Sequence, residues 1–79
     1  MRWVPLNMRS TPPHLMLTPR ERDLVRGIIA GCTNREIARE LGINEQSVKN
    51  VLSTIYLKCR VRNRLELALF AVKHQLVRD

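Results

Sequence analysis

Residues 33–48 read TNREIARELGINEQSV, and this pattern predicts two helices joined by a tight turn. Thr33 and Glu36 form a capping box, in which each side chain accepts a hydrogen bond from the other residue's backbone, so a helix is expected over 34–41. Gly42 ends this helix because glycine takes a positive φ without steric cost. Two short helices with a glycine in the turn between them are typical of a helix-turn-helix.

A longer helix is expected over 45–59, opened by Asn44 or Glu45. Ala38 is small where the two helices would meet, and Ile43 fills the angle between them. Apolar residues then recur at positions i, i+4, i+7 and i+11, which places them on one helical face. These residues are Val48, Leu52, Ile55 and Cys59.

Two further helices, over 19–30 and 64–76, flank this motif. The first begins with a second capping box at Thr18 and Glu21, and the second begins with a cap pattern at Asn63. No strand-like alternation of useful length appears, so the expected fold is all-α, a four-helix bundle with a central helix-turn-helix. The expected buried stripes are Leu24, Val25, Ile28 and Ile29 in the first helix, and Leu65, Ala68, Leu69, Val72 and Leu76 in the last.

The length of 79 residues allows one domain, which we expect over 17–79. Residues 1–16 contain three of the four prolines and no clear periodicity, and they are expected to form a flexible tail or linker. No apolar run approaches the roughly 20 residues of a membrane span, and no secretory signal is recognised. We therefore expect a cytoplasmic protein.

The chain carries a net charge of +7 and a pI of about 10.8, which favours an acidic partner, either nucleic acid or an anionic membrane surface. No acidic residue occurs from Gln46 to Leu65. A segment of one sign that begins on the helix over 45–59 is typical of a surface that contacts phosphates. The basic residues of this segment are Lys49, Lys58, Arg60, Arg62 and Arg64.

The outer face of the helix over 45–59 carries side chains that can read bases. Lysine donates to guanine O6 and N7, and asparagine or glutamine pairs with adenine N6 and N7. The sequence therefore predicts contacts with double-stranded DNA. The residues expected on this face are Gln46, Lys49, Asn50, Ser53 and Thr54.

Enzyme and metal chemistry find no support in the sequence. Cys32 and Cys59 are far apart, and His14 and His74 lie near opposite ends, so no zinc-ligand spacing and no nucleophile–base motif occurs. We expect two buried free thiols, no cofactor, no metal site and no catalytic residue.

Several motifs in order resemble the C-terminal DNA-binding domain of the LuxR/NarL/GerE family. The resemblance covers roughly residues 17–76 and implies a four-helix domain that binds inverted-repeat DNA as a homodimer. It implies that the third helix enters the major groove and that the fourth forms the dimer contact. The motifs are LTPRE at 17–21, NREIA at 34–38, SVKN at 47–50, IY at 55–56 and VRNR at 61–64.

Carried over by position, Lys49 and Asn50 match groove-facing residues, and Ser53 matches a further base or phosphate contact. Lys58 and Thr33 match phosphate contacts. We add Gln46, Ser47 and Arg62 to the expected DNA-contacting set. The chain departs from the family pattern at four positions. At one of them, Arg60 replaces a common glycine and would need a strained or different helix cap. The other departures are Val51, Leu57 and Cys59.

The helix over 64–76 has a second apolar face, opposite Leu65 and Val72. So small a domain cannot bury both faces, so dimerisation is expected to cover the second one, although Phe70 alternatively turns into the core. A competing function is a protein-interaction module that contacts RNA polymerase or an antagonist through Leu57, Leu67 and Phe70. The expected dimer residues are Leu67, Phe70, Ala71 and His74.

Overall fold

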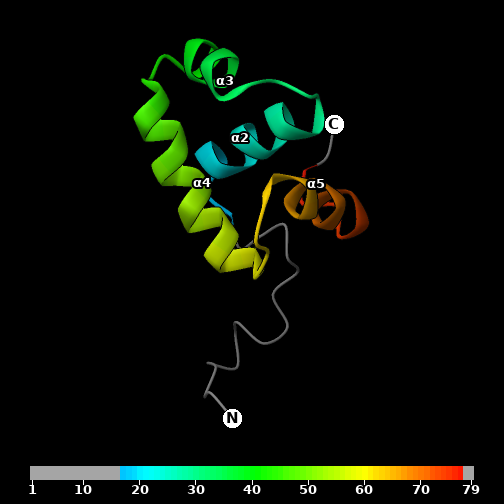
Figure 1. Ribbon diagram of the computed structural model, residues 1–79. Coiled ribbons are helices and arrows are strands. Elements are labelled where there is room, and N and C mark those ends of the chain that lie inside the picture. The colour runs from blue at the N-terminus through cyan, green and yellow to red at the C-terminus, as the bar shows by residue number, and fades with distance from the viewer. Residues whose placement is uncertain (1–16, 78–79) are drawn as a thin grey trace.

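The computed structural model describes residues 17–77, which form four helices and no strand (Figure 1). This confirms the all-α prediction, and the first three helices begin and end within one residue of their expected bounds. The expected tail over 1–16 lies outside the described residues. The helices are α2 (Pro19–Ile29), α3 (Asn34–Leu41), α4 (Glu45–Cys59) and α5 (Arg64–Lys73).

Each of these four helices begins with a side chain that accepts a backbone hydrogen bond from the first turn. Thr18 and Thr33 form the two predicted capping boxes. The α4 cap is Asn44, whose side-chain Oδ1 accepts from the backbone N–H of Ser47 at 2.8 Å. Asn63 caps α5 in the same way. The caps satisfy backbone donors that a helix start otherwise leaves unpaired.

All four helices within residues 17–77 also end in the same type of backbone turn. A residue with positive φ follows each helix, and the next N–H then donates to the carbonyl five residues back, as in Ile43 to Ala38 at 3.0 Å. This is the Schellman arrangement. The residues with positive φ are Gly31, Gly42, Arg60 and Gln75.

The turn at Gln75 explains why α5 ends at Lys73 and not at residue 76 as expected. Gln75 has a φ of 51°, and the backbone N–H of Leu76 donates to the Ala71 carbonyl at 3.0 Å. Leu76 is 1% exposed, so it reaches the core through this turn and not as part of a helical stripe.

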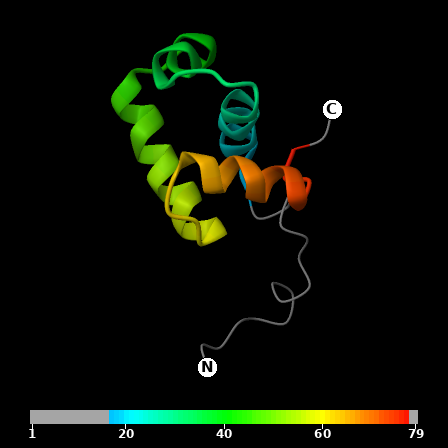
Figure 2. The same cartoon turned by 45° about the vertical axis from the view of Figure 1, so that its right-hand side comes forward.

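One aliphatic core lies between the helices. In Figures 1 and 2, α3 lies at one end of the long α4, and α5 crosses beside α2. The predicted stripe of α4 is buried, whereas Ile29 of α2 is 39% exposed and Cys59 is half-buried. The buried apolar residues are Leu17, Leu24, Val25, Ile28, Ile37, Ala38, Val48, Leu52, Ile55, Leu67, Ala71 and Leu76.

The two faces of α5 are largely exchanged relative to the sequence prediction, although Ala68 packs against the core as expected. Leu67 and Ala71 are 0% and 1% exposed and belong to the core, so the expectation that they form a dimer contact is wrong. Leu65, Leu69 and Val72, which were expected inside, are 68%, 63% and 64% exposed. The physical reason is that the packing of α5 on α2, and not the pattern of α5 alone, selects which of its two apolar faces is buried.

The other two residues of the expected dimer set lie at the edge of the core. Phe70 is half-buried and packs against the core, which agrees with the alternative expectation that this side chain turns inward. Its ring lies 4.3 Å from the exposed His74 ring, centroid to centroid. Phe70 and His74 therefore contact each other within one chain.

Candidate nucleic-acid interface

The exposed face of α4 gathers the side chains that the sequence proposed for base reading. Gln46, Lys49, Asn50 and Ser53 are all exposed, within 15 residues of continuous helix. Their orientation follows from the opposite face, where Val48 and Ile55 are completely buried. The hydrophobic core thereby fixes how this polar face is presented.

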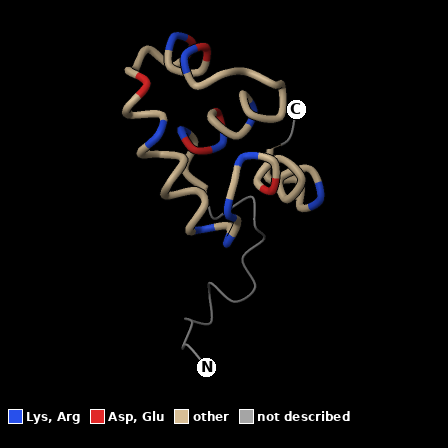
Figure 3. The backbone as a smooth tube through the Cα atoms, viewed as in Figure 1, with Lys and Arg blue, Asp and Glu red and all other residues tan. Residues whose placement is uncertain are grey.

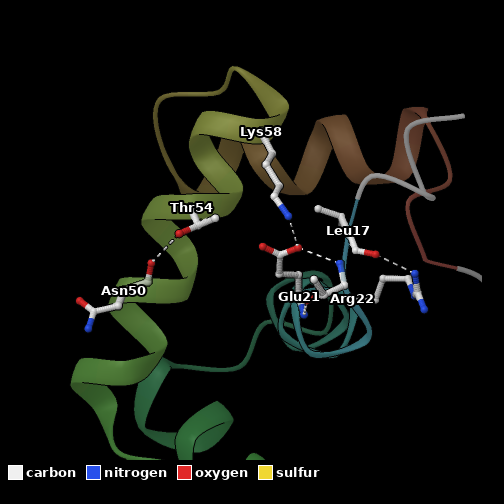
Figure 4. A network of polar contacts seen from close by, with 7 residues as sticks. Leu17, Glu21, Arg22, Asn50, Thr54 and Lys58 are labelled. Carbon is white, nitrogen blue, oxygen red and sulfur yellow. Dashed lines mark hydrogen bonds and ion pairs between the residues drawn. The ribbon is translucent and has the colours of Figure 1, made fainter. Parts of the chain in front are cut away.

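Hydrogen bonds along α4 order part of this face. The Gln46 Nε2 donates to Asn50 Oδ1 at 3.1 Å, one helical turn away. The hydroxyls of Ser53 and Thr54 donate to the backbone carbonyls of Lys49 and Asn50, at 3.1 and 3.4 Å, and the second of these bonds is drawn in Figure 4. The ammonium of Lys49 has no hydrogen bond or ion pair within residues 17–77 and remains available to an anionic or acceptor group.

In the structure, acidic and basic residues lie on different elements, as their order in the sequence predicts. Figure 3 shows acidic residues on α2, on α3 and at the first turn of α4, whereas basic residues alone follow along α4 and the connection to α5. The next acidic residue is Glu66, in the first turn of α5. Beyond its first turn, α4 therefore carries no acidic side chain that would repel a phosphate.

Lys58, expected at a phosphate, forms an ion pair with Glu21. Its Nζ lies 2.8 Å from the Glu21 Oε1, across 37 residues of sequence, and Figure 4 shows it pointing from α4 toward the start of α2. The same carboxylate oxygen accepts from the Thr18 backbone N–H at 2.7 Å. Lys58 thus ties α4 to the capping box of α2.

The environment of Glu21 favours its ionised form. Burial by itself raises the pKa of this carboxyl, but hydrogen bonds from Lys58 and Thr18, together with the charge of Lys58, outweigh it and leave the pKa below the ordinary 4.5. The Glu21 residue is 5% exposed, and a buried carboxylate that lost its cation would be strongly destabilising.

The remaining expected DNA contacts lie at helix starts. Thr33 is exposed, but its backbone N–H donates to the Glu36 carboxylate at 2.8 Å, so that group is already occupied. This hydrogen bond also lowers the pKa of Glu36. Ser47 is half-buried in the first turn of α4, whereas Arg62 is exposed and uses its backbone N–H to bond Glu66 at 2.9 Å.

Arg64, part of the basic segment, forms an internal bridge that sequence reasoning missed. Its guanidinium donates to the Asn34 side chain at 2.7 Å and to the backbone carbonyl of Cys32. The start of α5 is therefore bonded to the start of α3 and to the loop before it. A contact over 30 residues leaves no local signal in the sequence.

The two cysteines are unpaired thiols and are half-buried, not fully buried as expected. Burial, together with the negative charge of Glu21, raises the pKa of the Cys59 thiol and lowers its reactivity. Within 17–77, no three His, Cys, Asp or Glu side chains gather closely enough to hold a metal ion. In the same residues, no helix is both long and apolar enough to cross a membrane.

Proteins named as transcriptional regulators are similar in sequence to this chain. The chain is 43% identical over 63 residues to the uncharacterized transcriptional regulatory protein YhcZ of Bacillus subtilis, covering 80% of this chain and 29% of that protein. It is 40% identical over 65 residues to the probable regulator GfsR of Streptomyces halstedii, covering 82% and 27%. The nitrate/nitrite response regulator NarL of Escherichia coli is 37% identical over 60 residues, covering 76% and 28%.

The chain thus spans less than a third of the length of these three relatives. The family of bacterial regulatory proteins described as luxR matches residues 15–71, a segment that contains α2, α3, α4 and most of α5. With this match over most of its residues, and with the helix-turn-helix that its structure displays, the chain belongs to the luxR family of bacterial regulatory proteins and carries a transcription regulator's DNA-binding domain.

Proposed function

We propose that this domain binds specific sites in duplex DNA as a homodimer, with α4 in the major groove, and thereby regulates transcription. The observation that carries the proposal is the exposed face of α4 with Gln46, Lys49, Asn50 and Ser53 on it, which holds no acidic residue beyond the first turn of the helix. A helix of 15 residues is about 22 Å long, and the major groove, about 12 Å wide, admits such a helix.

The structure supports different roles for the two lysines of α4. Lys49 is exposed with no partner in the described residues, so we assign it to base or phosphate contact. The ammonium of Lys58 bonds a buried carboxylate, so we assign it to holding α4 against α2. We keep Arg62, Thr33 and Ser47 as candidate phosphate contacts, because all three lie in the first turn of a helix or just before it.

The dimer contact that we propose uses the outer face of α5. Leu65, Leu69 and Val72 are separated by four and three residues and are each more than 60% exposed, so they form one apolar stripe. Ile29 of α2 adds a fourth exposed aliphatic side chain. A second copy that covers this stripe would remove it from water in both subunits, as a two-fold interface does.

The test is fluorescence anisotropy with a random-sequence duplex at several salt concentrations, followed by selection of a preferred site. Steep loss of affinity with salt is expected, and the slope of log K against log salt divided by about 0.9 gives the phosphates neutralised. Absence of binding at low salt and micromolar protein would contradict the proposal.

Lys49→Ala separates base reading from phosphate contact. If Lys49 reads bases, affinity for the selected site falls by about 1–3 kcal/mol, while affinity for random DNA falls much less. Lys73→Ala is the matched control, since it removes the same charge from the end of another helix. Equal losses on both duplexes would reassign Lys49 to a phosphate.

The competing protein-interaction function now rests on Leu57. Of the three side chains expected to dock a partner such as RNA polymerase, Leu67 is buried and Phe70 is half-buried, whereas Leu57 is 81% exposed. Leu57→Lys distinguishes the two functions. Loss of regulation with intact DNA binding would favour a protein partner at this residue. The cytoplasmic location remains a prediction, consistent with binding to bacterial DNA.

A further inference from the structure

We propose that Arg60 binds a DNA phosphate at the C-terminal end of α4. The inference rests on the DNA-binding function proposed above. It goes beyond that function by dividing the basic residues at the end of α4 and before α5 into two that hold the domain together and two that face DNA. These residues are Lys58, Arg60, Arg62 and Arg64.

The two outer residues of this group are engaged inside the domain. The Lys58 Nζ lies 2.8 Å from the Glu21 carboxylate. The Arg64 guanidinium donates to the Asn34 side chain at 2.7 Å and to the backbone carbonyl of Cys32. These bonds tie the end of α4 to α2 and the start of α5 to α3, so both side chains are committed to contacts within the domain.

The two inner residues, Arg60 and Arg62, are exposed on either side of an anchored valine. Val61 is half-buried and packs against the core, and its backbone N–H donates to the Tyr56 carbonyl at 3.1 Å. Within residues 17–77, neither inner guanidinium has a hydrogen bond or an ion pair. Figure 3 shows the basic residues gathered around the C-terminal end of α4. The inner pair is therefore available to an anion there.

The end of α4 needs a cation before a phosphate can approach it. The unpaired carbonyls of a helix C-terminus carry a partial negative charge, which repels anions. Lys58 lies in the last turn of α4, but its charge is compensated by the Glu21 carboxylate. Arg60 follows the helix directly and is the next cation along the chain. It supplies the charge that lets DNA lie against this end of the helix.

The backbone of Arg60 shows that this position would suit glycine better. Its φ of 56° lies in the left-handed region, and the other two turns that join successive helices use Gly31 and Gly42. Glycine adopts this region without steric cost, whereas a side chain is strained there. Gln75 shares the conformation without a charge, so the conformation alone does not mark a DNA contact. What it provides is a test, because Arg60→Gly removes the guanidinium and the strain together.

The distance along α4 also fits a phosphate contact. Ser53 and Arg60 are seven residues apart, which corresponds to about 10 Å along a helix axis. The major groove is about 12 Å wide. With Ser53 at the base edges, Arg60 is expected at the phosphate strand that borders the groove.

The first experiment measures anisotropy with a random-sequence duplex at several salt concentrations for the wild type, Arg60→Gly and Arg60→Lys. Lys73→Ala, which removes a charge from the end of α5, is the matched control. For each bound copy, Arg60→Gly should lower the slope of log K against log salt by about 0.9 and the affinity at 0.1 M salt by about eightfold. Arg60→Lys should keep the slope, and Lys73→Ala should change it much less.

Thermal unfolding of the same variants separates this contact from a structural role. Arg60→Gly should unfold at the same temperature as the wild type or higher, so that its affinity falls while its stability does not. A residue that served only the fold would lose both together. An unchanged salt slope in Arg60→Gly, an equal loss of slope in Lys73→Ala, or a slope in Arg60→Lys as low as in Arg60→Gly would each overturn the inference.

The second experiment locates the contact on the DNA. Each phosphate of the selected site is replaced in turn by an uncharged methylphosphonate, and dissociation constants are measured for the wild type and Arg60→Gly. One replacement should weaken the wild type several-fold and leave Arg60→Gly unchanged, because the partner charge is already missing. If every replacement weakened both proteins equally, Arg60 would act only through the overall charge, and the inference would fail.

These outcomes separate the inference from the function on which it rests. A wild-type protein that does not bind the random duplex at low salt contradicts the proposed function itself. A wild-type protein that binds with a steep salt dependence, while Arg60→Gly binds with the same slope and affinity, contradicts the role of Arg60 alone.

Discussion

Replacing Leu67 with alanine tests which face of α5 belongs to the core. Leu67 is 0% exposed, and removing a buried leucine side chain costs about 2–5 kcal/mol, because the transfer energy is lost and a cavity remains. A domain of this size has a free energy of unfolding of about 4–12 kcal/mol. Leu67→Ala therefore removes a large fraction of the stability.

The matched control is Leu69→Ala, on the same helix and with the same change in side chain. Leu69 is 63% exposed, so most of its side chain gains nothing from folding, and we expect a cost below about 1 kcal/mol in the isolated chain. Alanine is also a slightly better helix former, which acts equally at both positions.

Urea unfolding followed by circular dichroism, at protein concentrations low enough to keep the chain monomeric, measures both variants. With a slope of about 1 kcal/mol per molar urea, Leu67→Ala shifts the midpoint by about 2 M or more, and Leu69→Ala by less than about 1 M. If the proposed dimer forms, Leu69→Ala at high concentration should lose the stability that dimerisation would give the wild type. If Leu69→Ala were the more destabilising variant in dilute solution, the assignment of the two faces would be wrong.

Three further predictions concern stability. Glu21 stabilises the fold above its ordinary pKa of 4.5, and this contribution is lost as the pH falls through its lower folded pKa, so urea midpoints between pH 6 and about pH 3 should fall more for the wild type than for Glu21→Gln. Arg60, at a φ of 56°, tolerates glycine better than valine: thermal unfolding should place Arg60→Val about 1–2 kcal/mol below Arg60→Gly, and equal stabilities would argue against strain there. Gly27→Ala should lower the melting temperature although alanine favours helices, because its Cβ would lie 2.8 Å from Ile37 Cγ1; a higher melting temperature would mean that Ile37 moves aside easily.

Local chemistry explains why most helix boundaries were predictable. The capping boxes at Thr18 and Thr33 are complete within four residues of sequence, and the glycine at 42 marks a turn that few other residues adopt. The end of α5 was missed because Gln75 adopts the same positive φ without being a glycine. A glutamine carries no signal for this conformation in a sequence.

The parts of the structure that sequence reasoning missed depend on contacts between distant segments. α5 is apolar on two faces, and its own periodicity cannot say which one packs against α2. The pairing of Lys58 with Glu21 joins residues 37 apart, so a lysine that matched a phosphate contact proved to be bonded inside the domain. The exposed face of α4 was predictable because one helix carries both the polar residues and the apolar stripe that orients them.

The bridge made by Arg64 bears on the spacing of the DNA sites that a dimer would accept. Arg64 bonds the start of α5 to Asn34 and to the Cys32 carbonyl, while Leu67 and Ala71 lock the same helix into the core. If two copies join through α5, each α4 is then rigidly placed relative to the two-fold axis. Inserting one base pair between half-sites turns one of them by about 34° around the DNA, because a full turn takes about 10.5 base pairs. A domain without a hinge between these helices would tolerate little of that rotation. A change in the spacing between half-sites would then lower the affinity as a change of base does.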